Sequence, residues 1–312
     1  MAMDKLVKYV ASIFLIVFTA FIDVNIHPKT YFQKALSLIK EHSIHSEDVD
    51  WEAIEENSMA AIDTVTSIEG TYSSIKAALR ATDRHSFFVP PQRARKEFKM
   101  SSEAPEIRSE IMMACLGYIE IPSFSGNEKA AEKFVGNIQR AIKRLDAHAL
   151  KGWIIDLRVN EGGNMWPMLA GLSSLLNSDT LGYFRKADGS LKSWVATSRG
   201  VHLDTELIQA IKKPLSLSNQ NKPVSVLIGG KTKSSGEALA IAFVGQEKAL
   251  LYGQKTYGLS TANSGFELED GAMLFITTSV FVDRNKRDYG FSVEPNVTSE
   301  QPLAEVFRFH NL

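Results

Sequence analysis

The stretch VSVLIGGKTKSSGEALAIAF, residues 224–243, combines the patterns of a strand, a tight turn and a helix. It opens on a β-branched apolar run typical of a buried strand and ends on apolar residues with helical spacing. The Gly/Ser-rich turn between them can cradle a phosphate, and it can also present a strained catalytic serine. The stretch by itself leaves these two unrelated functions open.

The spacing of the glycines argues against a phosphate loop. That loop requires a glycine five positions before its Gly-Lys pair, so that successive backbone N–H groups wrap the phosphates. Gly230 and Lys231 supply the pair, but the required position is Ser225, inside the strand. An S-x-x-K motif at residues 37–40, typical of penicillin-binding proteins, lies on an amphipathic helical pattern without the accompanying S-D-N sequence. A nucleophile elbow therefore fits the stretch best.

Ser234 and Ser235 lie at the turn, where a serine between a strand and a helix is held exposed by a strained backbone. The N–H that follows such a serine, together with the helix N-terminus, would stabilise a negatively charged oxygen. Gly236 permits close approach, and Glu237 can complete a helix-start interaction. An ordinary N-cap is the alternative, because Ser-Ser-x-Glu satisfies that motif as well. Local sequence decides neither between these roles nor between the two serines.

A serine nucleophile needs a base, and the sequence favours His85. It lies in DRHSFFVPP, residues 83–91, where a helical pattern stops and two prolines make the following chain rigid. A histidine at such a junction can be delivered to a cleft; a capping or structural histidine is the alternative. Five other histidines lie in charged, polar or terminal contexts: His42, His45, His148, His202 and His310.

Two adjacent glycines follow another strand pattern. Residues 152–168, GWIIDLRVNEGGNMWPM, read as a buried strand that ends in Asn-Glu-Gly-Gly. Gly162 and Gly163 can turn backbone N–H groups closely toward a ligand, as an oxyanion hole requires. A plain turn is the alternative.

The chain divides into regions with different patterns. Residues 1–27 contain two lysines before a fourteen-residue apolar run, 9–22, which predicts a signal peptide or a short membrane anchor; a buried core helix is the alternative. Residues 28–85 predict a helical bundle and 86–115 a linker. Residues 116–312 alternate strands with helices, which predicts an α/β core with cap strands around 180–200.

Composition excludes several classes of function. The formal net charge of −1 provides no basic surplus for nucleic acid. The single cysteine, Cys115, excludes an internal disulfide and a cysteine-based zinc cluster, and its apolar context predicts a buried, inert thiol. We therefore expect no metal and no cofactor, and the sequence predicts no particular oligomeric state.

Three stretches in this order, DRHSFF, DLRVNEGG and TKSSGEALAIAF, together resemble the tail-specific (C-terminal-processing) serine peptidase family. Residues 252–296 strengthen the resemblance, because their G-x-x-T-x-G, S-T-A-N, D-G-A-x-L and D-R motifs look like that family's closing sheet. Within the family the chain is most similar to the nisin resistance protein branch, and the resemblance covers essentially the whole chain after residue 30.

The resemblance implies an α/β fold with a Clp protease/crotonase-like ββα core, an N-terminal helical bundle and no PDZ domain. It aligns Ser234 with the family nucleophile. Many members use a lysine twenty-five residues later as base, but that position is Leu259 here, so a Ser-Lys dyad is excluded. The histidine-using branch has its base in the H-S-F motif, which here is His85.

Further roles follow from the resemblance. Backbone N–H groups of Ser235 and of Gly162 or Gly163 would hold the oxyanion. Glu294 is a candidate for orienting the base, because some relatives use a late glutamate, although the branch often has an aspartate where this chain has Asn296.

The branch implies an exported serine endopeptidase, membrane-anchored or secreted, that trims the C-terminal region of a short peptide such as a lantibiotic-like antimicrobial. Degradation of the C-terminal tails of exported proteins in general is an alternative that fits the same chemistry. A catalytically silent module for ligand or peptide binding is a third reading, from a different class. Such a module would be expected to have lost the serine or the histidine, and both remain. We therefore expect peptide or protein tails as partners, and the membrane through the N-terminal segment.

Overall fold

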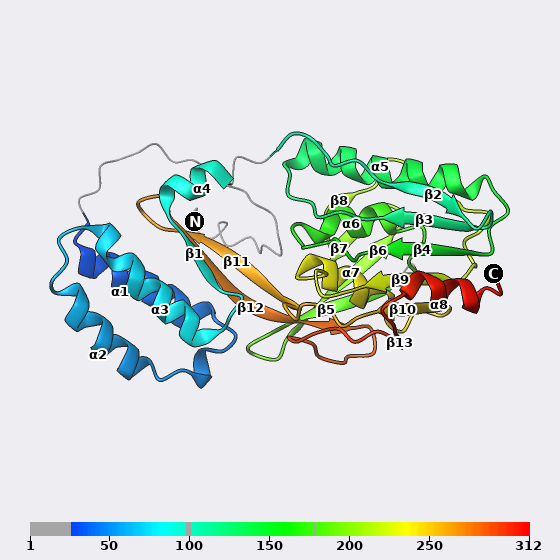
Figure 1. The fold of residues 1–312 in the computed structure, drawn as a ribbon. Helices are drawn as coiled ribbons and strands as arrows, with labels where there is room; N and C mark the ends of the chain where they lie inside the picture. Colours follow the sequence, from blue (N-terminus) through cyan, green and yellow to red (C-terminus); the bar gives the residue numbers. More distant parts are fainter. Residues whose placement is uncertain (1–25, 98–100, 178) are drawn as a thin grey trace. The chain divides into compact units, whose positions relative to one another are not determined.

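The computed structural model describes residues 26–97, 101–177 and 179–312 (Figure 1). They form two compact units. The helical unit comprises 26–97, 186–188 and 262–279, and the core unit comprises 101–177, 179–185, 189–261 and 280–312. The expected signal or anchor segment, 9–22, lies outside the described residues. Within the described part of the chain, no helix is both long and apolar enough to cross a membrane.

The helical unit begins with the three helices that the sequence predicts. They are α1 (Pro28–His42), α2 (Trp51–Ile62) and α3 (Tyr72–Thr82), separated by the short 3₁₀ segments η1 (Ser46–Asp48) and η2 (Ile68–Thr71). Helix α1 begins at a proline, whose fixed φ suits the first helical turn. Helix α2 begins after Asp50, whose side chain accepts a hydrogen bond from the N–H of Ala53 at 3.0 Å.

Three strands contribute to the helical unit. Strand β1 (Phe87–Val89) pairs antiparallel with β12 (Met273–Asp283), and β12 also pairs with β11 (Thr261–Glu267). Helix α4 (Pro91–Glu97) follows β1. Residues 262–279, which lie late in the sequence, thus belong to the same compact unit as the N-terminal helices.

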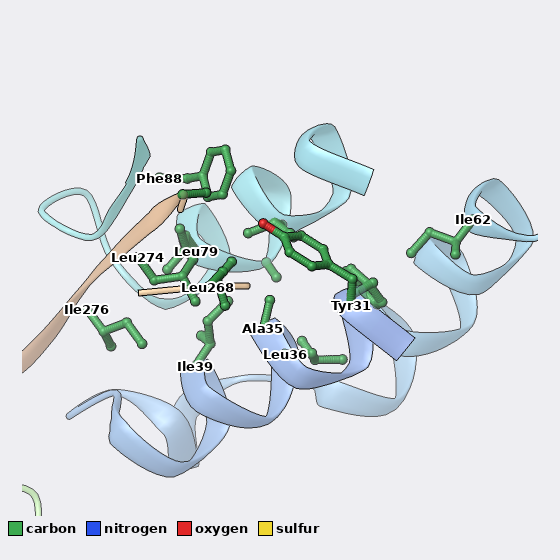
Figure 2. Packing of buried hydrophobic residues seen from close by; sticks show 14 residues of the cluster. Tyr31, Ala35, Leu36, Ile39, Ile62, Leu79, Phe88, Leu268, Leu274 and Ile276 are labelled. Carbon is green, nitrogen blue, oxygen red and sulfur yellow. The ribbon is translucent and has the colours of Figure 1, made fainter. Parts of the chain in front are cut away.

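Figure 2 shows the hydrophobic cluster that holds this unit together. Apolar residues of α1 and α3 pack against those of β1 and of the β11–β12 hairpin, among them Phe32, Ala35, Leu36, Ile39, Ile75, Leu79, Phe88, Leu268, Leu274 and Ile276. In the hairpin turn, Asp270 accepts hydrogen bonds from the hydroxyls of Tyr31 at 2.7 Å and Tyr72 at 2.5 Å. Because burial and the nearby carboxylate both disfavour a phenolate, the pKa of each tyrosine is raised. Apolar and polar contacts together fix the hairpin to the helices.

The core unit contains a six-stranded sheet in the order β13-β10-β9-β4-β3-β2. Its strands are β2 (Ser109–Met112), β3 (Leu116–Glu120), β4 (Gly152–Asp156), β9 (Val224–Ile228), β10 (Ala249–Gly253) and β13 (Val297–Thr298). Strand β2 is antiparallel to β3, and the other neighbouring pairs are parallel. Every residue of β4 and β9 is buried, as expected of central strands in a parallel sheet covered on both faces.

The remaining elements of the core unit complete the α/β pattern. Its helices are α5 (Glu128–Asp146), α6 (Met165–Leu172), α7 (Ser235–Phe243) and α8 (Pro302–Phe309). An antiparallel meander consists of β5 (Thr180–Lys186), β6 (Leu191–Thr197), β7 (Gly200–Leu203) and β8 (Glu206–Ala210). Between α3 and β3 the described residues form only β1, α4 and β2, so this part of the chain shows no PDZ sheet.

The order of the strands determines which turns of the core unit lie close together. Parallel strands end at the same edge of a sheet, so the turns after the neighbouring strands β4, β9 and β10 are brought together. The expectation that Cys115 is buried is wrong. Cys115 precedes β3 and is partly exposed while it packs against a cluster that includes Leu116 and Tyr118.

Replacement of Ile39 by alanine tests the cluster of the helical unit. Ile39 is fully buried, so the Ile39→Ala variant should lose about 2–5 kcal/mol of unfolding free energy, because a cavity replaces packed atoms. Gln33, exposed on the same helix, gives the control Gln33→Ala, which should leave the free energy nearly unchanged. Urea unfolding measures both, and equal losses in the two variants would contradict the packing.

Candidate active site

Strand β9 ends at Ile228 and α7 begins at Ser235, so Ser234 lies at the turn that joins them. Its backbone has φ 51° and ψ −119°, a left-handed conformation that residues with a Cβ rarely adopt. Ser234 is the N-cap of α7 and forms a capping box with Glu237, yet an ordinary N-cap has an extended backbone. A strained serine between a strand and a helix is instead the geometry of a nucleophile elbow, at a cost of order 1–3 kcal/mol.

The two serines of the turn differ in their surroundings. Ser235 is 4% exposed, and its hydroxyl donates a hydrogen bond to the carbonyl oxygen of Gly163 at 2.5 Å. Ser234 is half-buried and has the strained backbone. Because the hydroxyl of Ser235 is committed to a backbone carbonyl, Ser234 is the better candidate for a nucleophile.

The buried carboxylate of Glu237 holds the elbow in place. It accepts hydrogen bonds from the N–H groups of Ser234, Gly258 and Leu259, each at 2.8 Å, and from Thr256 Oγ1 at 2.5 Å. Burial raises the pKa of this carboxyl group, although the four hydrogen bonds act in the opposite direction. The bond from Ser234 is the helix-start interaction that the S-x-x-E pattern predicts. Glu237 therefore ties the elbow to the turn that follows β10.

The Gly-Gly turn after β4 approaches the elbow closely. Gly162 has φ 104°, and a Cβ added there would lie 3.0 Å from the Cβ of Ser234. Gly163 has φ 112°, and a Cβ added there would lie 2.0 Å from the carbonyl oxygen of Phe124. Both positions therefore require glycine, for backbone conformation and for space.

The N–H groups beside the elbow are used differently. The N–H of Gly162 donates to Asn160 Oδ1 at 2.9 Å, so it is already occupied. The carbonyl of Gly162 accepts a hydrogen bond from the N–H of Phe124 at 3.2 Å, and a trans peptide places the N–H of Gly163 on the opposite side. Among the hydrogen bonds of the described residues, none is donated by the N–H of Gly163 or of Ser235. These two groups are thus available to an oxyanion.

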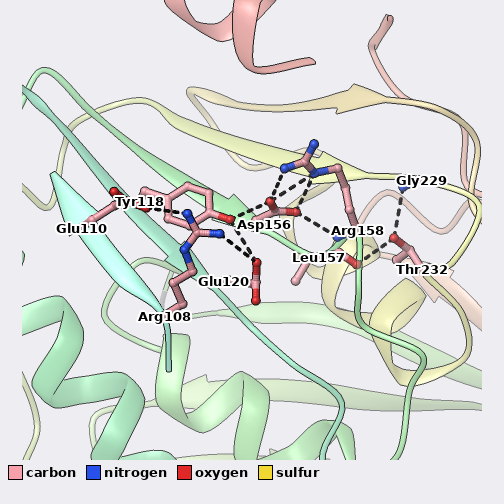
Figure 3. A network of polar contacts seen from close by, with 9 residues as sticks. All are labelled: Arg108, Glu110, Tyr118, Glu120, Asp156, Leu157, Arg158, Gly229 and Thr232. Carbon is pink, nitrogen blue, oxygen red and sulfur yellow. Dashed lines mark hydrogen bonds and ion pairs between the residues drawn. The ribbon is translucent and has the colours of Figure 1, made fainter. Parts of the chain in front are cut away.

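Direct contacts join the Gly-Gly turn to the elbow. Thr232 Oγ1 donates to the carbonyl of Leu157 at 2.8 Å (Figure 3), and the N–H of Lys233 donates to the carbonyl of Asn160 at 3.1 Å. The ammonium of Lys233 also pairs with Glu161 at 2.8 Å, and this hydrogen-bonded ion pair lowers the pKa of Glu161. An exposed ion pair adds little stability, so the buried and main-chain hydrogen bonds fix the two turns.

Hydrogen bonds to Asp156 hold the end of β4 (Figure 3). This carboxylate is 2% exposed and accepts hydrogen bonds from the backbone N–H of Arg158 at 3.0 Å, from its guanidinium at 2.6 Å, and from the hydroxyl of Tyr118 at 2.8 Å. The hydrogen bond to Asp156 raises the pKa of Arg158. The Asp-Leu-Arg motif therefore starts the Gly-Gly turn from a fixed point.

His85 belongs to the helical unit, between α3 and β1. Asp83 Oδ1 accepts hydrogen bonds from the N–H groups of His85 and Ser86, both at 2.6 Å, and from Thr277 Oγ1 at 2.9 Å. On the other side, Asn263 Nδ2 donates to the carbonyl of His85 at 2.8 Å. The backbone of His85 is thus held by a loop carboxylate and by the β11–β12 hairpin.

The surroundings of His85 and Asp83 shift the pKa of both groups and so determine their protonation at neutral pH. Burial lowers the pKa of His85 to about 4, with Asp83 acting to raise it and Arg84 to lower it. For Asp83, burial acts to raise the pKa, but hydrogen bonds from Ser86, Thr277 and His85 outweigh it and hold the pKa below its usual range. At neutral pH, His85 is therefore a neutral imidazole and Asp83 a carboxylate.

The structure distributes the residues predicted from the sequence over both units. Ser234, Ser235, Gly162 and Gly163 meet in the core unit, where Glu294 is an exposed residue of the segment before β13. Its neighbour Asn296, the position where the branch often has an aspartate, accepts a hydrogen bond from the N–H of Leu251 at 2.8 Å.

Three residues that order the site escaped prediction. Asp83 lies two residues before His85, a spacing typical of a turn in which an aspartate accepts backbone N–H groups, so a signal was present. Asn160 gave no such signal, because its role depends on which way its side chain points. Asn263 is 178 positions from His85 in sequence, and a single sequence does not reveal such a contact.

These features define a class: α/β proteins with a strained serine between a strand and a helix, beside backbone N–H donors from a neighbouring turn. Residues 115–299 match the sequence profile of peptidase family S41, and the chain belongs to this family. It is 27% identical over 288 residues to the nisin-resistance protein of Lactococcus lactis subsp. lactis, covering 90% of this chain and 86% of that protein. It is 28% identical over 194 residues to the chloroplastic carboxyl-terminal-processing peptidase 2 of Arabidopsis thaliana, covering 62% of this chain and 32% of that protein.

Solved structures show the same fold. A lipoprotein from Streptococcus agalactiae superposes with a TM-score of 0.80 at 25% identity, covering 94% of this chain and 99% of that one. The photosystem II D1 C-terminal processing protease has a TM-score of 0.62 at 14% identity, covering 88% of this chain and 94% of that one, and this likeness concerns the fold alone. The predicted family and the predicted α/β fold with N-terminal helices are confirmed.

Alanine substitutions at two glycines test the geometry of the Gly-Gly turn. Gly163→Ala should destabilise the protein more than Gly189→Ala, since both have positive φ but only the alanine at 163 would overlap a carbonyl oxygen. We expect about 1 kcal/mol for the left-handed backbone at 189, and about 1–3 kcal/mol more at 163 because the turn must shift. Urea unfolding compares the two variants. Equal losses of unfolding free energy would show that the turn can accept a Cβ beside the carbonyl oxygen of Phe124.

Proposed function

We propose that this protein is a serine endopeptidase that cleaves near the C-terminal region of peptides or exported proteins, with Ser234 as nucleophile and His85 as base. The observation that carries the proposal is the strained turn at Ser234, flanked by the available N–H groups of Ser235 and Gly163. Membership of family S41 and the likeness to C-terminal-processing peptidases support it.

The proposed reaction follows from these groups. The Oγ of Ser234 attacks the peptide carbonyl carbon, its proton passes to the imidazole of His85, and the carbonyl π electrons move onto oxygen. The N–H groups of Ser235 and Gly163 stabilise that oxyanion. When the C–N bond breaks, the imidazolium protonates the leaving amine. Water, deprotonated by the same histidine, then attacks the acyl carbon; the bond to Ser234 Oγ breaks, and the imidazolium returns the proton to Oγ.

Of the two glycines considered for the oxyanion hole, we propose Gly163, because the N–H of Gly162 already donates to Asn160. A neutral His85 suits the role of base, because an imidazole that is already protonated cannot accept the serine proton. We retain Glu294 as the proposed orienting residue for His85.

For the substrate, we propose an exported peptide antimicrobial of the lantibiotic kind, met outside the cytoplasm by an exported enzyme that is secreted or held at the membrane by its N-terminal segment. The likeness to the nisin-resistance protein over most of both chains supports the substrate. The likeness to a lipoprotein structure and the apolar run at 9–22 support export.

Substitution of the two proposed catalytic residues provides the central test. Ser234→Ala and His85→Ala should each lower peptide turnover by about 10⁴-fold or more, because residues of such a catalytic set act as a unit. His148 is exposed, so His148→Ala is a matched histidine control that should retain activity. Mass spectrometry of products from lantibiotic and linear unstructured peptides locates the cleaved bonds. Undiminished turnover by Ser234→Ala would overturn the proposal.

The acid limb of the pH profile should lie below the ordinary histidine value. Because the pKa of His85 is lowered from 6.5 to about 4, kcat/KM should stay level between about pH 7 and pH 5 and fall near pH 4. A histidine with a lowered folded pKa favours folding while it is neutral, so its contribution is lost as pH falls from 6.5 toward 4. Tryptophan fluorescence therefore has to confirm that the protein stays folded at each pH. An acid limb at pH 6.5 would contradict the lowered pKa of His85.

A further inference from the structure

Ser235 contributes to the site with its backbone and with its side chain. Its N–H lies at the first position of α7, where no partner exists within the helix. Its hydroxyl donates to the carbonyl oxygen of Gly163 at 2.5 Å, and the residue is 4% exposed. A buried hydroxyl that faces a backbone carbonyl is not placed to contact substrate, so its effect on the reaction must pass through Gly163.

Hydrogen bonds restrain the peptide groups on both sides of Gly163. On one side, the carbonyl of Gly162 accepts from the N–H of Phe124 at 3.2 Å. On the other, the N–H of Asn164 donates to the carbonyl of Phe124 at 2.7 Å, while the carbonyl of Gly163 accepts from Ser235. Phe124 thus holds the turn from the side of β3, and the Ser235 hydroxyl holds it from the side of the nucleophile.

These restraints matter because Gly163 has little preference of its own. Glycine adopts positive and negative φ about equally, so its φ of 112° persists only while neighbours fix the adjoining peptide groups. The direction of the Gly163 N–H follows that φ. When a restraint is lost, the N–H can turn away from the point where the oxyanion forms while the fold stays intact.

We propose that the Ser235 hydroxyl is a positioning residue of the oxyanion hole, which locks the Gly163 N–H onto the developing oxyanion. The inference rests on the proposed function of Ser234 and Gly163. In this arrangement, one residue supplies a donor through its backbone and aims the other donor through its side chain. The two halves of the hole, from the turns after β4 and β9, are thereby kept at a constant separation.

Ser235→Ala tests the inference directly, because it removes the hydroxyl and keeps the backbone N–H. Complete loss of an oxyanion donor typically costs about 10²–10³-fold in rate. A donor that is present but less well aimed should cost less, so we expect kcat to fall about 10–100-fold with KM unchanged. Ser225, a buried serine near the start of β9, gives the matched control Ser225→Ala, which should leave kcat within about twofold of wild type.

A pair of binding measurements separates positioning from general damage. A peptide aldehyde that adds to Ser234 creates an oxyanion in the hole, and its affinity for Ser235→Ala should fall by the same factor as kcat/KM. The intact peptide makes no oxyanion, so its Kd should be the same for Ser234→Ala and for the double variant Ser234→Ala/Ser235→Ala. A matching loss in the second measurement, or a kcat within twofold of wild type for Ser235→Ala, would overturn the inference.

The same variants distinguish a failure of the proposed function from a failure of the positioning role of Ser235. Full turnover by Ser234→Ala means that the proposed function itself is wrong. Loss of turnover in Ser234→Ala together with full turnover in Ser235→Ala means that the peptidase proposal holds and the positioning role does not.

Discussion

The strained backbone of Ser234 depends on the buried carboxylate of Glu237. A serine backbone with positive φ costs of order 1–3 kcal/mol, and it persists only where its surroundings determine its conformation. Glu237, one turn into α7, accepts the Ser234 N–H and also binds Thr256, Gly258 and Leu259. The carboxylate therefore couples the elbow to the turn after the next strand, and both turns are fixed by a group that solvent does not reach.

The local part of this arrangement could be predicted from the sequence. The strand, turn and helix at 224–243 follow from a β-branched run, a Gly/Ser-rich turn and apolar helical spacing, and S-x-x-E predicted the bond between Glu237 and Ser234. The Asn-Glu-Gly-Gly turn was predictable for the same reason, because adjacent glycines after a strand pattern permit the backbone conformations of a tight turn. In each case the partners lie a few residues apart, within the reach of one sequence pattern.

The rest depends on contacts that a single sequence does not specify. The choice between Gly162 and Gly163 depends on the side chain of Asn160, whose Oδ1 occupies one N–H. The anchoring of His85 depends on Asn263, which lies far away in the chain on a hairpin that belongs to the helical unit. The lowered pKa of His85 results from burial, which is a property of the packed protein. The residue types were visible in the sequence, and their partners were not.

The two proposed catalytic residues are held by the same chemical device. Asp83 accepts a hydrogen bond from the N–H of His85, and Glu237 accepts one from the N–H of Ser234, so each carboxylate holds the backbone of a proposed catalytic residue. A carboxylate this close to the nucleophile would repel a developing oxyanion if its charge were uncompensated. The four donors around Glu237 and the positive end of α7 offset that charge. The proposed oxyanion is then stabilised by two N–H groups that come from separate turns. Such a site requires a constant distance between the turns, which explains why so many contacts join them.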